Sequence, residues 1–174
     1  PEGEDFLEWI DVKGNTIRPN NRSALNMVEG NKVLQVLSNL HESFSIQGKT
    51  PSFGIVTPFK AQAKFFRDKL IEEYDESIIR ESVLIADTAH KFQGDERDII
   101  IFSPVISEGV HNNSGTINFL RRTSNLFNVS VTRARSMLRV VGDKNRCMES
   151  GVSYLKNFVE WIEVKKFESL DLPY

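Results

Sequence analysis

The stretch Asp87–Asp98 reads DTAHKFQGDERD and places many polar side chains between two apolar runs. The first run ends at Ala86 and the second begins at Ile99. Each run has the length and composition of a buried strand. A simple connection between strands needs only a few turn residues. A threonine, a histidine, a glutamine, a glycine and several acids in one connection therefore indicate a chemical site.

Two alternatives stay open for this stretch when it is taken alone. Carboxylates and imidazoles bind divalent metal ions, as in metal-dependent nucleases. The groups of this kind are Asp87, His90, Asp95, Glu96 and Asp98. No second cluster with matching spacing supports that interpretation, so we predict no metal site of the chain's own. The other alternative is a polar loop that carries no chemistry.

A second informative stretch, residues 128–135, reads NVSVTRAR. If it is helical, Arg133 and Arg135 point to different faces, because residues two apart on a helix are not neighbours. The two side chains are therefore predicted to have different roles. A guanidinium group offers a planar, permanently charged fork to a transferring phosphoryl group. Two ordinary surface arginines are the alternative.

One short segment resembles the end of a phosphate-binding loop. Gly48, Lys49 and Thr50 match its last three positions, but the full pattern also requires a glycine five residues before Gly48. That position holds Ser43, and Pro51 follows Thr50. The chain is therefore expected to lack a phosphate-cradling loop of its own.

The composition is typical of a globular protein. The chain has 174 residues, of which 40% are hydrophobic and 26% are charged, and this length is enough to bury a core without disulfides. We expect a single domain over residues 1–174, in which residues 147–174 form a C-terminal helical extension. The formal net charge is −2. Nucleic-acid binding would therefore need a local basic patch, such as the arginine-rich segment 121–146.

Three features of the sequence bear on the cellular location of the protein. No apolar run approaches the roughly 20 residues of a membrane-spanning helix, so no membrane partner is expected. The single cysteine, Cys147, rules out an internal disulfide and is typical of a reducing compartment. This predicts an intracellular, cytoplasmic protein. The chain begins at Pro1 rather than at an initiator methionine, which indicates a fragment of a longer protein.

The expected elements alternate between strands and helices. Strands are expected at residues 6–12, 53–56, 83–86, 99–102 and 138–141. Helices are expected from an Asn26 cap to about Phe44, from a Thr57 cap with Pro58 in the first position to about Tyr74, within residues 118–135, and at residues 154–165. This alternation predicts an α/β fold with a mostly parallel sheet and helices on both faces. In such sheets, ligands bind at the carboxyl ends of the strands.

Three segments, in the right order, resemble motifs of the superfamily 1 helicases. They are residues 57–62 (TPFKAQ, motif IV), 87–96 (DTAHKFQGDE, motif V) and 128–135 (NVSVTRAR, motif VI). From about Asp5 to Arg146 the chain resembles the C-terminal RecA-like domain of these helicases, in the nonsense-decay and nuclease-helicase branch. Asn125 and Leu126 stand where eukaryotic members often carry two arginines, which resembles a bacterial branch better. Motifs I, II and III are absent, since they belong to the N-terminal motor domain.

The resemblance implies a three-layer RecA-like sandwich and a role in ATP hydrolysis. ATP and Mg²⁺ would lie between two motor domains, with the metal held mainly by the N-terminal one. Arg133 would be the arginine finger that reaches the γ-phosphate across the cleft. Gly94 would let the backbone approach that phosphate, and Glu96 would accept a hydrogen bond from the ribose. Gln93 and Arg135 are the other residues implied at the nucleotide.

The same resemblance implies a track for single-stranded DNA or RNA. Thr57, Pro58 and Phe59 would line the track, mostly through backbone and shape. Thr88 and His90 would face its phosphates, so motif V would touch both ligands. The implied partners are the N-terminal RecA-like domain and nucleic acid, and the chain alone is expected to hydrolyse no ATP. The alternative function is a non-catalytic RecA-like module that docks nucleic acid or protein.

Overall fold

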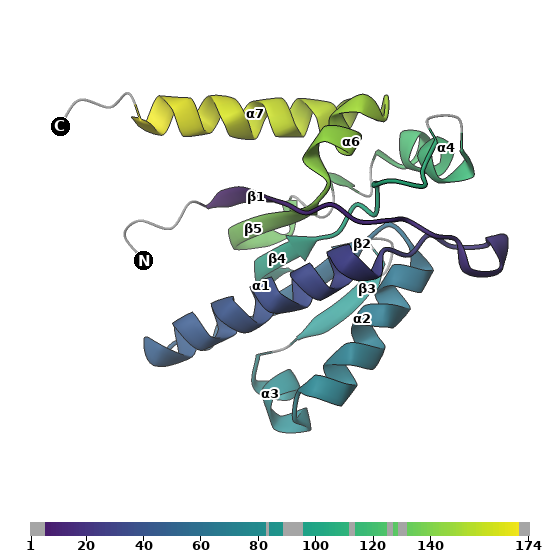
Figure 1. The fold of residues 1–174 in the computed structure, drawn as a ribbon. Coiled ribbons are helices and arrows are strands. Elements are labelled where there is room, and N and C mark those ends of the chain that lie inside the picture. The colour runs from purple at the N-terminus through teal and green to yellow at the C-terminus, as the bar shows by residue number, and fades with distance from the viewer. Residues whose placement is uncertain are drawn as a thin grey trace.

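The structure is a computed structural model that describes residues 6–82, 84–88, 96–111, 114–124, 127–128 and 132–170. His90, Gln93 and Gly94 lie outside these ranges. Within them, five parallel strands form one sheet in the order β1-β5-β4-β2-β3 (Figure 1). The strands are β1 (Leu7–Asp11), β2 (Phe53–Thr57), β3 (Ile85–Thr88), β4 (Arg97–Phe102) and β5 (Ala134–Gly142). The predicted α/β fold with a parallel sheet is confirmed.

Helices cover both faces of the sheet (Figure 1). One face carries α1 (Met27–Ile46), α2 (Lys60–Glu73) and α3 (Glu76–Glu81), and the other carries α4 (Gly115–Arg122), α6 (Lys144–Glu149) and α7 (Ser153–Leu170). A short 3-10 turn, η1 (Pro19–Asn21), lies in the connection between β1 and α1. The sequence did not predict α3 and α6. Among the described helices, none is both long and apolar enough to cross a membrane.

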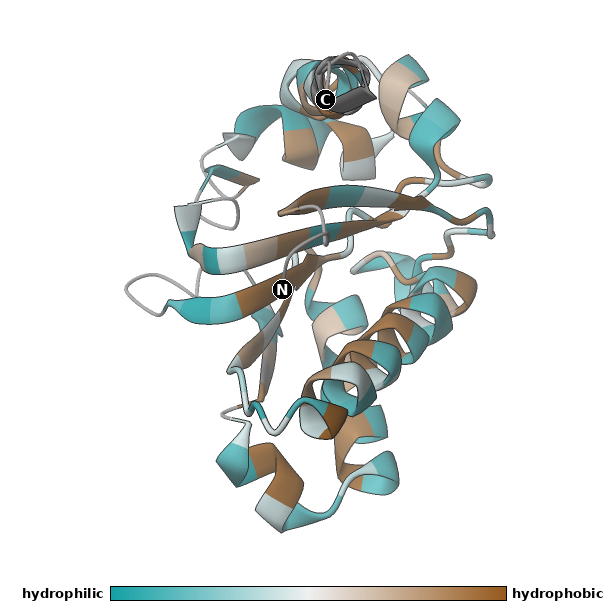
Figure 2. Cartoon of the chain, turned by 90° about the vertical axis from the view of Figure 1, so that its left-hand side faces the viewer, coloured by the Kyte–Doolittle hydropathy of each residue, from teal (hydrophilic) through white to brown (hydrophobic). Residues whose placement is uncertain are grey.

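Alternate residues of the central strands enter two apolar layers. In β4, Ile99 and Ile101 pack with residues of α1 and α2, while Ile100 and Phe102 pack with residues of α4 and α7. Figure 2 shows hydrophobic residues along the strands and on helix surfaces next to the sheet. Because both faces of these strands are buried, their sequences read as continuous apolar runs rather than as an alternation.

The residue directly before motif VI, Phe127, is anchored in one of these layers. Phe127 is buried, and its ring centroid lies 5.2 Å from that of Phe102 and 4.8 Å from that of Phe158 in α7. Both contacts are edge-to-face, an arrangement that stabilises aromatic pairs beyond the area they bury. Helix α7 therefore holds the start of motif VI against the sheet.

The start of α2 differs from the expectation. Thr57 remains in β2, because the ladder with β3 continues to the pair of Thr57 with Thr88. The N-cap is Phe59, whose side chain makes no capping bond, and the predicted Thr57 cap is wrong. Instead, the Ala61 amide donates a hydrogen bond of 3.0 Å to Ser23 Oγ. A side chain remote in sequence thus satisfies one of the unpaired amides at the beginning of the helix.

The strand β5 begins at Ala134, earlier than the expected start at Leu138. β4 also begins early, and its first residue, Arg97, pairs with Ala134. The Arg97 amide donates to the Arg133 carbonyl at 3.1 Å. Pairing with β4 therefore draws the end of motif VI into an extended conformation, and Arg135 lies on a strand instead of a helix.

A buried polar network joins α1, α2 and the loop that follows β4. Gln62 of motif IV is fully buried, and its side chain bonds the Asn26 amide at 2.9 Å, the Asn26 carbonyl at 3.1 Å and Ser103 Oγ at 3.3 Å. Ser103 Oγ donates to Glu29 Oε1 at 2.5 Å, and the Val105 amide donates to the same oxygen at 2.9 Å. A buried donor or acceptor that loses its hydrogen-bond partner destabilises the folded protein by roughly 1–3 kcal/mol. The network therefore fixes three segments relative to one another.

Glu29 holds a strained turn in this network. Val105 has φ of 60°, a left-handed conformation that is unfavourable for a β-branched residue. Burial raises the pKa of the Glu29 carboxyl group from 4.5 to about 8, and the nearby Asp143 also raises it. Glu29 Oε2 is buried and has no hydrogen-bond partner among the described residues. A neutral carboxyl group is therefore the favoured form near neutral pH.

We predict that Glu29→Gln removes a specific pH dependence of stability. The raised pKa means that the folded protein binds this proton more tightly than the unfolded chain does. Stability is therefore fully supported at low pH and falls as the pH rises from about 4.5 to about 8. Denaturant unfolding measures the free energy of unfolding at pH 5 and at pH 8. From pH 5 to pH 8, this free energy should fall by roughly 3–4 kcal/mol more for wild type than for the variant.

The exposed Glu42 of the same helix provides the control. Glu42→Gln should keep the pH profile of the wild-type chain. Equal pH profiles for Glu29→Gln and wild type would show that the buried carboxyl group does not titrate as described.

Candidate functional site

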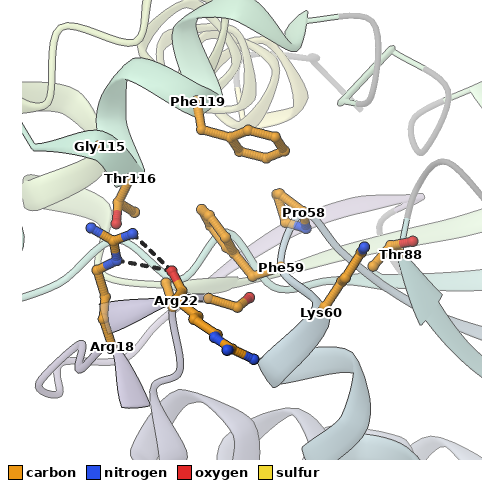
Figure 3. A pocket seen from close by; sticks show the side chains of 11 residues that line it. Arg18, Arg22, Pro58, Phe59, Lys60, Thr88, Gly115, Thr116 and Phe119 are labelled. Atoms are coloured by element: carbon orange, nitrogen blue, oxygen red, sulfur yellow. Dashed lines mark hydrogen bonds between the residues drawn. The ribbon is translucent and has the colours of Figure 1, made fainter. Parts of the chain in front are cut away.

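A pocket of about 540 Å³ lies at the carboxyl ends of β2 and β3 (Figure 3). It brings Pro58 and Phe59 of motif IV together with Thr88 of motif V. The side chain of Thr57 is fully buried and does not line the pocket, and His90 lies outside the described residues. The lining residues are Arg18, Arg22, Ser23, Ala24, Pro58, Phe59, Lys60, Thr88, Gly115, Thr116 and Phe119.

The pocket is basic, although the formal net charge of the chain is −2. Arg18, Arg22 and Lys60 line it, and its lining residues in the described part of the chain include no carboxylate. Two helices also begin there, α2 after Phe59 and α4 at Gly115. The amino end of a helix carries partial positive charge and unsatisfied N–H groups, both of which favour anions. The pocket is therefore suited to a phosphate group.

The segment 18–22 has a defined shape at the edge of the pocket. Arg18 Nε and Nη2 donate to the Arg22 carbonyl at 3.0 and 2.8 Å (Figure 3). Between them, Asn20 and Asn21 have φ of 55° and 54°, a conformation that asparagine tolerates better than most residues. Arg18 thus braces the segment, while no described residue forms an ion pair with the exposed side chain of Arg22.

Phe119 of α4 forms an aromatic wall of the pocket. It is 37% exposed, and its ring centroid lies 5.6 Å from that of the buried Phe59, with an angle of 46° between the rings. Sequence reasoning missed four of the lining residues that give the pocket its charge and its aromatic wall: Arg18, Arg22, Lys60 and Phe119. Their residue types were visible in the sequence, but their convergence depends on how three remote segments meet.

A second cluster lies at the other end of the strands, where β4 and β5 begin. Glu96 comes directly before β4, and Arg133 comes directly before β5. Arg135 Nε lies 3.0 Å from Glu96 Oε2, and Arg133 Nη1 lies 3.9 Å from Glu96 Oε1. Side chains two apart along an extended segment point to the same side, so both arginines approach one carboxylate. Arg135 lies in β5, so the helical premise under which the two arginines would point to different faces is wrong, and their different roles stay a prediction.

The ion pairs of Glu96 with Arg133 and Arg135 are weak, so a ligand could replace them. The side chains of Glu96, Arg133 and Arg135 are 46%, 31% and 58% exposed, and exposed ion pairs contribute only about 0–1 kcal/mol. Arg133 Nε is buried without a hydrogen-bond acceptor among the described residues. An anionic ligand at this edge would give Arg133 additional acceptors at little cost in existing contacts.

The two clusters lie at opposite ends of the parallel strands. Across β2, the register places Thr88 just beyond Phe102, the last residue of β4, whereas Glu96 precedes the first residue of β4. A strand rises about 3.3 Å per residue, so roughly 20 Å separates the clusters along the strand direction. The connection 89–95 links these two edges along the chain. Only the Thr88 cluster lies at the carboxyl edge where ligands were expected.

The described acids do not gather as a metal site would require. Asp87 Oδ1 lies 3.3 Å from Arg67 Nη1. Asp98 Oδ2 accepts hydrogen bonds from the Ser52 amide and hydroxyl at 2.8 and 2.7 Å, and the amide bond is the main reason its pKa is lowered. Asp98 therefore ties the start of β4 to the residues before β2. No group of three or more potential metal ligands occurs among the described residues.

Comparison with known proteins agrees with this geometry. A family model described as an AAA domain matches residues 2–145. The chain is 34% identical over 134 residues to "Helicase sen1" of Schizosaccharomyces pombe, which covers 77% of this chain and 8% of that protein. It is 31% identical over 176 residues to "DNA polymerase alpha-associated DNA helicase A" of Saccharomyces cerevisiae, with 97% of this chain and 23% of that protein covered.

A third relative extends the same pattern to an animal. The chain is 32% identical over 144 residues to "Probable helicase senataxin" of Mus musculus, which covers 81% of this chain and 5% of that protein. The chain thus spans only a small part of each of these relatives. The family match covers the sheet, both clusters and the segments that resemble motifs IV, V and VI. The chain therefore belongs to this AAA-domain family, as a C-terminal RecA-like domain of a superfamily 1 helicase.

Proposed function

We propose that this chain is the second motor domain of an ATP-dependent helicase or translocase. In this role it completes an ATP site between two domains and contacts single-stranded DNA or RNA. The observation that carries the proposal is the separation of the two ends of motif V. Thr88 lines the basic pocket at one edge of the sheet, and Glu96 meets Arg133 and Arg135 at the other. A connection with one end at each ligand can couple ATP hydrolysis to movement along a strand.

At the nucleotide, the N-terminal motor domain would supply the phosphate loop and hold Mg²⁺. Negative charge builds on the γ-phosphoryl oxygens as the bond to the leaving group breaks, and a guanidinium from across the cleft stabilises it. We assign this role to Arg133. Glu96 would accept a hydrogen bond from the ribose and release its exposed contacts with the arginines. Gln93, Gly94 and Arg135 would complete this side of the nucleotide.

At the strand, the backbone of the nucleic acid would cross the basic pocket. Thr88 and His90 would contact phosphates, and Pro58 and Phe59 would shape the path, with Thr57 contributing through its backbone. The positive charge, with no carboxylate among the described lining residues, supports this assignment, because phosphate contacts dominate affinity for nucleic acid. Such contacts position the strand without reading its sequence.

We predict that Arg133→Ala lowers ATP turnover by about 10³- to 10⁵-fold in a protein that carries both motor domains. Arg133→Lys should restore little, because a point charge cannot replace the planar fork. Steady-state ATPase measurements with saturating single strand test this. Arg80→Ala is a matched control, since Arg80 is an exposed arginine that pairs with Glu76 on α3.

Thermal melting of the 174-residue chain distinguishes a catalytic from a structural role for Arg133. Its exposed ion pair contributes little, so the melting temperature of Arg133→Ala should stay within a few degrees of wild type. A large fall in melting temperature would make Arg133 a structural residue and move the finger assignment to Arg135. Turnover within about twofold of wild type, with an unchanged melting temperature, would favour the non-catalytic docking module instead.

The 174-residue chain alone should show no ATP turnover, with or without single strands. The Gly48–Thr50 segment lacks the full pattern of the phosphate loop, whose backbone amides and lysine hold the β- and γ-phosphates. Lys49 is exposed next to the end of α1 and not in a strand-to-helix loop. Turnover stimulated by nucleic acid, and abolished by Lys49→Ala, would contradict the half-site assignment.

The variant Thr88→Val with His90→Ala should lose stimulation of ATPase by single strands in the two-domain protein. Valine keeps the size of the buried threonine but cannot donate a hydrogen bond to a phosphate. ATPase rate is measured against strand concentration, and nucleotide affinity is measured separately. Half-maximal stimulation should need roughly tenfold more strand, in keeping with the loss of one or two charged hydrogen bonds. Normal stimulation with poor nucleotide affinity would place these residues at the other ligand.

A further inference from the structure

The pocket holds more candidate binding groups than the residues assigned to the nucleic-acid track above. Arg22 and Lys60 are exposed cations without an ion-pair partner among the described residues. Phe119 exposes 37% of its surface beside them, although it sits on a helix whose other apolar residues, Ile117 and Leu120, are buried. An exposed aromatic ring next to unpaired cations is the combination that binds an unstacked nucleotide.

We propose that this pocket binds one nucleotide unit of the single strand. Its base stacks on Phe119, and its phosphate lies between Arg22 and Lys60. The inference rests on the proposed function, because it specifies how the same surface holds the strand. It adds Phe119, Arg22 and Lys60 to the residues assigned to the track, and Arg22 comes from the connection before α1.

The aromatic wall is placed for stacking on a base. Figure 3 shows Phe119 on one side of the pocket and Pro58, Lys60 and Thr88 on another. Phe59 contacts the Phe119 ring at 5.6 Å, so the ring has a fixed neighbour. The volume of about 540 Å³ falls in the range of roughly 300–1,000 Å³ that suits small ligands. Every base has a flat aromatic face, so this contact should tolerate all four bases.

The cationic wall is placed for a phosphate. Lys60 is the first residue of α2, and Gly115 and Thr116 are the first residues of α4. The phosphate would therefore lie near two helix amino ends as well as two side-chain cations. Arg18 has a different role, because its fork donates twice to the Arg22 carbonyl. We assign Arg18 as a positioning residue that fixes the backbone from which Arg22 extends.

The aromatic contact is tested by affinity for single strands. Fluorescence anisotropy with labelled 12-nucleotide oligo-dT and oligo-U is measured on the two-domain protein without nucleotide. Phe119→Leu keeps an apolar side chain but removes the ring, and it should weaken binding by about 5- to 150-fold. Phe119→Trp keeps a ring and should bind at least as well as wild type. Phe6→Leu is the control, because Phe6 is 52% exposed and does not line the pocket; its carbonyl accepts a hydrogen bond from the Leu138 amide of β5.

The cationic contacts are tested by salt dependence. Lys60→Gln and Arg22→Gln should each weaken binding and reduce the slope of log affinity against log salt by about 0.7 for a single strand. Lys49→Gln removes an exposed lysine outside the pocket and should leave the slope unchanged. Arg18→Lys keeps the charge but cannot donate from two nitrogens to the Arg22 carbonyl oxygen, so affinity should fall while the slope stays close to wild type.

The outcomes separate this inference from the proposed function. If Phe119→Leu and Arg22→Gln bind like wild type while Thr88→Val with His90→Ala binds weakly, the nucleotide subsite is wrong and the proposed function stands. If none of these variants changes binding, both are wrong. Free UMP or dTMP that competes as strongly as the oligonucleotide would also overturn the inference, since the pocket would then hold a free nucleotide rather than a unit of the strand.

Discussion

The buried network around Gln62 and Glu29 is the interaction on which the carboxyl-edge pocket depends. Three segments that form the walls of the pocket are hydrogen-bonded into this network. Gln62 joins the start of α2, Asn26 joins the connection before α1, and Val105 joins the loop toward α4. Loss of one partner would leave the others buried and unpaired, which is costly. The glutamine of motif IV therefore acts as a structural link, and the exposed residues around it can serve binding.

The parallel sheet separates the two proposed ligand surfaces, which lie at opposite ends of its strands. Isoleucine and phenylalanine side chains of the central strands are buried on both faces of the sheet, and such close packing resists a change in the strands themselves. Motif V offers the other route, because its ends lie at Thr88 and at Glu96. The Glu96 end is exposed and its ion pairs are weak, which allows rearrangement when a ligand binds.

The fold class could be predicted from the sequence because short apolar runs alternate with helical patterns, and the Asn26 cap of α1 was visible as a local signal. The failures come from contacts between distant residues. Ser23 replaces the expected Thr57 cap, and pairing with β4 moves Arg135 onto a strand. Motif residues lie in both clusters, and their roles at a ligand stay predictions. The cations and the aromatic ring of the pocket come from segments that only the fold brings together.

In the proposed function, this domain couples a nucleotide at the amino ends of the β-strands to single-stranded nucleic acid at their carboxyl ends. The most direct test measures the affinity of the two-domain protein for single strands without nucleotide, with ADP and with a non-hydrolysable ATP analogue. Coupling requires strand affinity to change by about fivefold or more between states, and nucleotide affinity to change by the same factor when the strand is bound. Glu96→Gln should reduce this factor while each ligand still binds. Equal strand affinity in all three nucleotide states would contradict the account.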